Sequence, residues 1–225
     1  MSKVPLLLAW SSGKDSAWSL HVLRQRRDVE VVGLLTTLSE AHDRVAMHAV
    51  RRDLLEAQAH AAGLPVRLVR IPSSCSDAQY EAAMGASIAA ARAQGVRGVA
   101  FGDLFLGDIR RYRERQMAST GLAPVFPLWQ RPTNTLAREM LAGGLRATLT
   151  CVDPRALAPS FAGRAFDASL LADLPPGVDP CGENGEFHTF AWDGPMFEAP
   201  VPVRKGDVVE RDGFVFADLL PAELP

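Results

Sequence analysis

The stretch Leu6–Leu20, LLLAWSSGKDSAWSL, decides the fold class. Its apolar run ends at Trp10, six small or polar residues follow from Ser11 to Ser16, and an amphipathic pattern begins at Ala17. This order predicts a buried strand, a tight turn and a helix. A helix that starts directly after a strand presents unpaired N–H groups and a partial positive charge. We therefore expect the turn to bind a phosphate group.

The side chains of this turn suit phosphate chemistry. Small residues let an anion approach the backbone, Lys14 supplies a compact positive charge, and Asp15 supplies oxygen ligands of the kind Mg²⁺ prefers. The turn is not a Walker A loop, because Leu8 occupies the place of that motif's first glycine and an aspartate follows the lysine. A serine-rich helix cap is the alternative interpretation. The residues expected to contact a nucleotide here are Ser11, Ser12, Gly13, Lys14, Asp15 and Ser16.

Apolar runs alternate with helical patterns along the first half of the chain. Gly63 and Gly95 stand where the second and third helices would end. Continuous apolar strands that alternate with helices predict an α/β fold with a doubly wound parallel sheet. The apolar runs span 5–10, 29–36, 66–71 and 98–101. The helical stretches are marked by Ala17, Leu20 and Leu23, by Ala46, Val50, Leu54, Ala57 and Ala61, and by Ala83, Ser87, Ile88 and Ala91.

The sequence changes character after about Pro132. Proline and glycine become denser, and the stretch 208–216, VVERDGFVF, predicts a β-hairpin that turns at Asp-Gly. We therefore expect two domains. Residues 1–132 would form the phosphate-binding domain, and residues 133–225 would form a smaller α+β lobe.

Composition limits the possible functions. The chain has 225 residues, 48% of them hydrophobic, and a formal net charge of −2, so a nucleic-acid-binding surface is not expected. We find no signal-peptide pattern or membrane-spanning run, which predicts a cytoplasmic protein without membrane contacts. Cys75, Cys151 and Cys181 are isolated and odd in number, which predicts reduced thiols rather than disulfides or a zinc site.

The end of the fourth apolar run carries a second group of candidate site residues. Gly102 and Asp103 stand at this point, and ligands of a parallel sheet bind beyond the carboxyl ends of its strands. Asp103 is therefore a candidate Mg²⁺ ligand together with Asp15. The charged residues that follow, Arg111 and Arg115 among them, equally fit a solvated helix with ion pairs.

The stretch 181–190, CGENGEFHTF, is the third candidate region. Glu183, Glu186 and His188 lie within six residues, and the alternation of Glu186 and His188 with apolar residues predicts polar side chains on one face of a strand. Two carboxylates and an imidazole can coordinate Mg²⁺, hold ammonia or ammonium, or relay a proton. A hairpin with incidental charges is the alternative interpretation.

The opening turn resembles the pyrophosphatase (PP) loop, S-G-G-K-D-S, of enzymes that cleave ATP between its α- and β-phosphates. Ser12 stands where glycine is usual, so Ser12 is expected to be strained if the position requires a positive φ. With the other motifs, nearly the whole chain is similar to the diphthine–ammonia ligase family of adenine nucleotide alpha hydrolase-like proteins. The segments that carry this resemblance are SSGKDS at 11–16, GD at 102–103, YRE at 112–114, PLW at 127–129 and GENGEFHT at 182–189.

The resemblance implies an ATP-dependent ligase that forms an amide. A substrate carboxylate would attack the α-phosphate of ATP, pyrophosphate would leave, and ammonia would then displace AMP. ATP and Mg²⁺ are the implied cofactors. The backbone near Leu35 and Thr36 would meet the adenine, and Met47 and His48 would fall in the following helix. The implied catalytic residues are Lys14 and Asp15 at the phosphates, and Glu183, Glu186 and His188 for the capture and deprotonation of ammonium.

The resemblance also suggests partners. The family's named activity uses a modified histidine of translation elongation factor 2. For this chain we expect a related carboxylate substrate, small or protein-borne, with free ammonium as the nitrogen source and a homodimer as the oligomeric state. A tRNA-modifying enzyme with the same loop is one alternative, which the isolated cysteines and the net charge disfavour. A nucleotide-binding sensor without turnover is another, which does not need the Lys14–Asp15 pair.

Overall fold

The computed structural model describes residues 2–41, 43–45, 48–72 and 75–222. Its first half is a doubly wound sheet, sheet A, with five parallel strands in the order β4-β2-β1-β5-β6. The short β3 pairs antiparallel with the end of β2. This arrangement confirms the predicted α/β fold. The strands are β1 (Val4–Ala9), β2 (Val29–Ser39), β3 (Arg44–Val45), β4 (Val66–Ile71), β5 (Gly98–Ala100) and β6 (Ala123–Val125).

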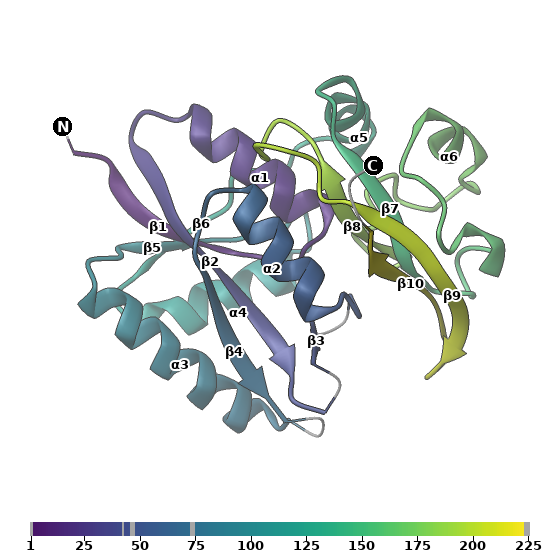
Figure 1. Ribbon diagram of the computed structural model, residues 1–225. Coiled ribbons are helices and arrows are strands. Elements are labelled where there is room, and N and C mark those ends of the chain that lie inside the picture. Colours follow the sequence, from purple (N-terminus) through teal and green to yellow (C-terminus); the bar gives the residue numbers. More distant parts are fainter. Residues whose placement is uncertain (1, 42, 46–47, 73–74, 223–225) are drawn as a thin grey trace.

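Four helices cover the two faces of sheet A. Helices α1 and α2 lie on one face, and α3 and α4 lie on the other (Figure 1). Alternate residues of β1 explain this layering, since Leu6 and Leu8 join the core beneath α1 and α2 whereas Leu7 joins the core beneath α3 and α4. The helices are α1 (Lys14–Gln25), α2 (Arg52–Ala61), α3 (Asp77–Ala93) and α4 (Gly107–Ala118).

The predicted start of the second helix is wrong. Helix α2 begins at Arg52, so Val50 precedes the helix and His48 lies in a turn. Ala49 has a φ of 55°, a left-handed conformation that no helix continues through. Ala46 and Met47, which we also expected in this helix, lie outside the described residues. The predicted helix ends are confirmed, because Gly63 and Gly95 follow α2 and α3 with positive φ.

The second half of the chain forms sheet B, an antiparallel sheet in the order β8-β7-β10-β9. The predicted hairpin is confirmed between β9 and β10, where Asp212 and Gly213 have φ values of 53° and 78°. The elements of this half are α5 (Thr133–Ala142), β7 (Arg146–Val152), the 3-10 helix η1 (Pro159–Phe161), α6 (Ala168–Asp173), β8 (Phe187–Asp193), β9 (Val203–Arg211) and β10 (Phe214–Pro221). The division at residue 132 stays a prediction.

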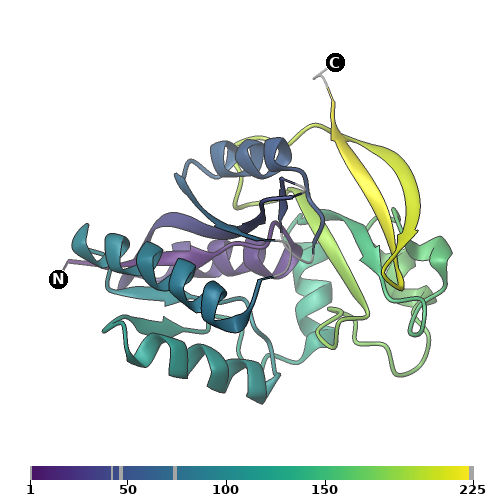
Figure 2. The ribbon, with the colours of Figure 1, turned by 90° about the horizontal axis from the view of Figure 1, so that it is seen from below.

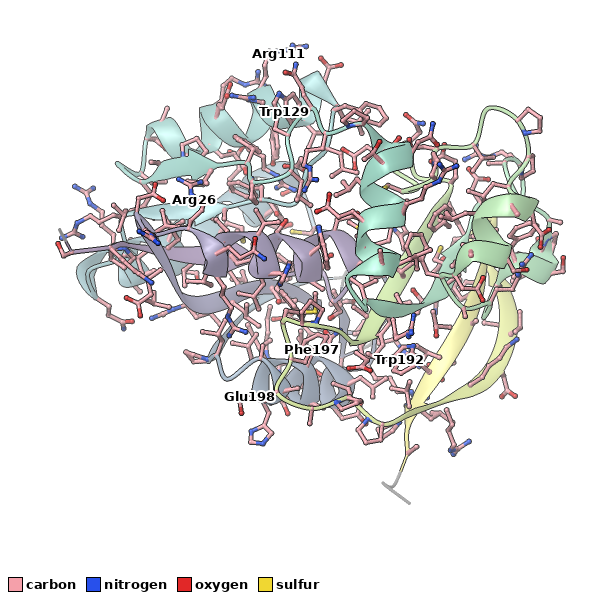
Figure 3. All side chains as sticks on the ribbon, turned by 90° about the horizontal axis from the view of Figure 1, so that it is seen from above. Arg26, Arg111, Trp129, Trp192, Phe197 and Glu198 are labelled. Atoms are coloured by element: carbon pink, nitrogen blue, oxygen red, sulfur yellow. The ribbon has the colours of Figure 1, made fainter. Side chains whose placement is uncertain are left out.

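The two sheets share one apolar core and are joined at β8. Residues of α1, α2, β7 and β8 belong to the same buried cluster, and Figure 2 shows sheet B beside the N-terminal end of α1. The segment after β8 returns to α2, where Glu198 donates its N–H to the Ala61 carbonyl at 2.7 Å. Figure 3 shows Phe197 and Glu198 beside this helix. Strand β8 itself is fixed against the turn before α1, because the Ala191 N–H donates to the Ser12 carbonyl at 2.9 Å.

Two expectations from composition can be compared with the structure. The thiols of Cys75, Cys151 and Cys181 are free, as predicted. None of the described helices combines the length and hydropathy that a membrane crossing requires.

Candidate active site

A cavity of about 660 Å³ lies at the carboxyl ends of β1, β2 and β5, and the start of β8 and the loop before it close one side. This is the position where parallel sheets bind ligands, and the volume is typical of ligand sites. The cavity brings together most of the residues predicted from the sequence. Those that line it are Ser11, Lys14, Asp15, Ser16, Leu35, Gly102, Asp103, Glu183 and His188.

The phosphate-binding turn has the strained backbone that its sequence suggested. Ser12 has a φ of 68°, which is favourable for glycine and unfavourable for serine. Its hydroxyl is buried and has no hydrogen-bond partner. The serine-cap interpretation finds no support, because the N-cap of α1 is Gly13 and no side chain caps it. Ser11 and Ser16 instead contact each other, Oγ to Oγ, at 3.2 Å beside the cavity.

Replacing Ser12 with glycine is expected to stabilise the protein. Relief of the left-handed strain is worth about 1–2 kcal/mol, and the greater freedom of glycine in the unfolded chain offsets about 0.5–1 kcal/mol of this. The free energy of unfolding in urea should therefore rise by about 0.5–1 kcal/mol. A decrease would show that Ser12 makes a contact that outweighs its strain.

Lys14 and Asp15 form an ion pair at the wall of the cavity. The Lys14 ammonium is 2% exposed and donates to Asp15 Oδ2 at 2.8 Å and to the Cys181 carbonyl. It also lies over the rings of Phe166 and Phe187. Burial lowers the pKa of Lys14, but the attraction of Asp15 and other nearby acidic groups raises it overall, so the ammonium stays charged.

Each of the two predicted metal ligands has a carboxylate oxygen that accepts no hydrogen bond from the described residues. Asp15 Oδ1 and Asp103 Oδ2 are both buried and accept no hydrogen bond. Arg113 Nε, also buried without a hydrogen bond, lies 3.8 Å from Asp103 Oδ2. Burial raises the pKa of both carboxyl groups. Gly102 lets the segment after β5 approach the start of α1 closely, since a Cβ at Gly102 would lie 3.2 Å from the Asp15 carbonyl carbon.

Glu183 reaches from the loop before β8 to the opposite wall of the cavity. Its Oε1 accepts the N–H of Leu104 at 2.7 Å and the N–H of Phe105 at 3.3 Å. Burial raises the pKa of Glu183 to about 7, and the charges of Asp15 and Asp103 act in the same direction. The group can therefore take up or release a proton near neutral pH.

Glu186 is not brought to the cavity. Its Oε1 accepts the Asp179 N–H at 2.9 Å and the Asn184 side-chain N–H at 2.9 Å, and its Oε2 accepts the Asn184 backbone N–H at 3.0 Å. Gly182 and Gly185 have φ values of 68° and 89°, so the chain turns before β8 begins and strand alternation does not apply to Glu186. The contacts of Glu186 hold its own loop.

Glu186→Gln tests this placement. An amide nitrogen in place of Oε2 would face the Asn184 N–H, so we expect the free energy of unfolding to fall by about 1 kcal/mol. Because Glu186 does not line the cavity, nucleotide affinity should stay within about twofold of wild type (~0.4 kcal/mol). Urea unfolding and calorimetric titration with ATP measure the two quantities. A large loss of nucleotide affinity without a loss of stability would show that Glu186 contributes to the binding site.

His188 lies in β8 and packs against His48. The centroids of the two imidazole rings are 4.5 Å apart, and both residues line the cavity. Burial lowers the pKa of His188 to about 4, and the charge of Lys14 adds to this effect. Burial also lowers the pKa of His48 well below its ordinary value. Both rings are therefore neutral at pH 7.

The predicted adenine site lies at an open stretch of the β2 edge. Strand β1 pairs with β2 as far as Leu35, and β3 pairs with β2 from Leu38 onward, so residues between them face no strand on that side. Leu35 and Thr37 line the cavity there. Thr36 is buried, and its hydroxyl donates to the Trp10 carbonyl at 2.8 Å. Leu35 with Thr37, rather than Thr36, borders the available space.

Some arginines of α4 form ion pairs on a solvated helix, and one of them lies at the candidate site. Arg111 points outward (Figure 3), is 63% exposed and pairs with Asp108 three residues earlier. Arg110 pairs with Glu114 at 2.7 Å in the same way. These contacts are those of a solvated helix. Arg113 differs, because it lines the cavity beside Asp103.

Comparison with protein families matches both halves of the chain. The model of the diphthamide synthase N-terminal domain matches residues 4–124, and the model of the diphthamide synthase C-terminal domain matches residues 132–216. The chain belongs to the diphthamide synthase family. Both sides of the cavity therefore come from segments that this family possesses.

Relatives with curated names are diphthine–ammonia ligases. The human protein is 34% identical over 128 residues, which are 54% of this chain and 48% of the human protein. The zebrafish protein is 33% identical over 129 residues, which are 54% of this chain and 50% of that protein. The fission yeast protein is 31% identical over 95 residues, 40% of this chain and 16% of the relative. The matched region is thus about half of the animal relatives and a smaller part of the yeast protein.

Sequence reasoning missed three residues that shape this family member's cavity. His48 was placed on a helix and given no role, Arg113 was counted among the charged residues of the helix after Asp103, and Asp179 was interpreted only as part of a turn with Pro180. Asp179 accepts the N–H of Cys181 at 2.9 Å and the Thr133 hydroxyl at 2.6 Å, and so anchors the loop that carries Glu183. The position of Arg113, two turns into the helix after Asp103, is the signal that could have identified it.

Proposed function

We propose that the protein is an ATP-dependent ligase that joins a carboxylate to ammonia. A substrate carboxylate oxygen attacks the α-phosphorus of ATP, the bond to the β-phosphate oxygen breaks, and pyrophosphate leaves. Ammonia then attacks the acyl carbon and displaces AMP. The observation that carries this proposal is the meeting of the Lys14–Asp15 turn and the Glu183–His188 segment at one cavity. The names of the matched relatives agree with this reaction.

In this proposal the turn holds the phosphates. The N–H groups at the start of α1 and the Lys14 ammonium stabilise the negative charge on the departing pyrophosphate. The adenine lies against the β2 edge at Leu35 and Thr37. Sheet B covers the phosphates and keeps water from the acyl-adenylate, which water would otherwise hydrolyse.

Mg²⁺ fits the acidic side of the cavity. Asp15 Oδ1 and Asp103 Oδ2 are buried and accept no hydrogen bond from the described residues, and carboxylate oxygens are ligands that Mg²⁺ prefers. When bound, the ion would neutralise charge on the phosphate oxygens. These two residues are therefore the proposed holders of the metal.

Glu183 and His188 are the proposed residues for ammonium. At neutral pH a carboxylate that is partly ionised can bind ammonium and take up a proton, and a neutral imidazole can accept a hydrogen bond from ammonium through its unprotonated nitrogen. Glu186 is left out, because its oxygens are occupied within its own loop. The structure of the carboxylate substrate, the homodimer and the cytoplasmic location stay predictions from the sequence.

The nature of the products tests the proposal. The protein should be incubated with Mg²⁺, ammonium and ATP labelled at the α-phosphate, with a panel of small carboxylates and a cell extract as substrate sources. Formation of labelled AMP with pyrophosphate, dependent on both the acid and ammonium, is expected. Labelled ADP would contradict the proposal, and nucleotide binding without any product would favour the sensor.

A further inference from the structure

Gln58 of α2 is buried beneath the phosphate-binding turn, and both ends of its amide have partners. Its Oε1 accepts the indole N–H of Trp10 at 3.0 Å. Its Nε2 donates to the Ser12 carbonyl at 3.0 Å and to the Ala191 carbonyl at 2.5 Å. Gln58 is 0% exposed and does not line the cavity. One amide thus ties the end of β1, the turn and β8 together.

Ser12 depends on such external contacts. A left-handed serine is disfavoured by roughly the free energy of a tenfold change in an equilibrium constant. The Ser12 hydroxyl has no partner that would offset this cost. Its carbonyl, in contrast, accepts two hydrogen bonds, from Gln58 Nε2 and from the Ala191 N–H at 2.9 Å. The backbone carbonyl is therefore the group through which the neighbours hold the strained conformation.

The orientation of this carbonyl also sets the next N–H group. In a trans peptide the C=O and the following N–H point in opposite directions. With the Ser12 carbonyl directed at Gln58, the Gly13 N–H points the other way, to the hydroxyl of Ser11 at 3.3 Å, and Ser11 lines the cavity. If the Ser12 carbonyl pointed in another direction, the Gly13 N–H would turn away from the side of the cavity.

We propose that Gln58 is a positioning residue for nucleotide binding. By anchoring the Ser12 carbonyl it keeps the turn in the strained conformation in which the Gly13 N–H and the Ser11 hydroxyl lie on the side of the phosphates. The inference rests on the proposed function, because ATP is the ligand that the turn is proposed to bind. Gln58 itself touches neither the cavity nor the nucleotide, so its effect is carried by Ser12.

Gln58→Met tests the inference, because methionine has a similar length and helix propensity but cannot donate. Calorimetric titration with the α,β-methylene analogue of ATP and Mg²⁺ should show about tenfold weaker binding. Amide hydrogen exchange of Gly13, measured without nucleotide, should be faster. Leu170→Ala is the matched control, because Leu170 is buried in α6 and does not line the cavity. It should lower the melting temperature and leave affinity within about twofold.

A double-mutant cycle separates positioning from general destabilisation. Glycine adopts a positive φ without strain, so in a Ser12→Gly background Gln58→Met should weaken binding by less than about twofold. An equal loss in both backgrounds, or wild-type affinity in Gln58→Met, would overturn the inference. If Gln58→Met does not fold, Gln58→Asn, whose amide is one methylene short of its partners, carries the same expectations.

The two proposals fail in different ways. Wild-type protein that does not bind the analogue would overturn the proposed function. Hydrogen exchange of Gly13 would still decide the role of Gln58 in that case, because it requires no nucleotide. Unchanged exchange in Gln58→Met would overturn the inference alone.

Discussion

Lys14→Met is expected to reduce the formation of AMP from ATP by roughly 10²–10³-fold, the usual effect of removing a group that stabilises developing charge. The ammonium is the buried partner of Asp15 and also holds the Cys181 carbonyl, so its loss affects the turn and the loop that carries Glu183. Methionine is one atom shorter than lysine, but it keeps an unbranched apolar side chain beside the rings of Phe166 and Phe187. The assay with α-labelled ATP measures the change.

Lys205→Met is the matched control for this prediction. Lys205 also donates to a backbone carbonyl, that of Ala162 at 3.4 Å, but it lies on β9 outside the cavity. Its variant should retain AMP formation within about twofold, since a surface contact of this kind contributes less than 1 kcal/mol. Equal activity in the two variants would refute a role for Lys14 at the phosphates.

Glu183→Gln is expected to stabilise the protein at high pH and to leave its stability unchanged at low pH. Glu183 has a pKa of about 7 in the folded protein and an ordinary value of 4.5. Folding therefore takes up a proton between these pH values, and the stability that this uptake supplies is present below about pH 4.5 and is lost as the pH rises through 7. Glutamine avoids the loss and still offers an oxygen to Leu104 and Phe105.

The difference between variant and wild type is the quantity to measure. Urea unfolding at pH 5 and pH 8 should show that the advantage of Glu183→Gln grows by about 2 kcal/mol, once the partial solvent access of the group is allowed for. Glu114→Gln, on the outer face of α4, should show no such growth. A flat difference for Glu183→Gln would mean that Glu183 ionises normally. If ionised Glu183 takes part in the reaction, AMP formation by the wild-type protein should rise through pH 7, and this rise should be absent in Glu183→Gln.

Much of the fold followed from the sequence because apolar runs have few alternatives. Strand β4 has the predicted bounds 66–71, β5 ends one residue earlier than predicted, and β1 begins and ends one residue earlier than predicted. Helix α2 was predicted to start too early because Val50 is buried and continues the helical spacing, although its segment is not helical. The spacing of buried residues does not reveal Ala49, whose left-handed backbone separates the two segments.

The candidate site was predictable where a residue's place follows from a strand end. Asp15 and Asp103 each follow a strand of the same parallel sheet, so their meeting at one edge could be expected. Glu186 could not be separated from Glu183 in this way, because the left-handed Gly182 before them and Gly185 between them redirect the loop. The contact between His48 and His188 joins two distant segments, and no local pattern indicates it.

The contacts of β8 with the turn have a consequence for the order of synthesis. The Ser12 carbonyl and the Lys14 N–H are paired with Ala191 and Thr189, residues translated some 175 positions later. A nascent chain on the ribosome can build the central sheet long before it has these partners. The proposed nucleotide site is therefore completed only after β8 has been translated, and a polypeptide that stops before β8 would lack it.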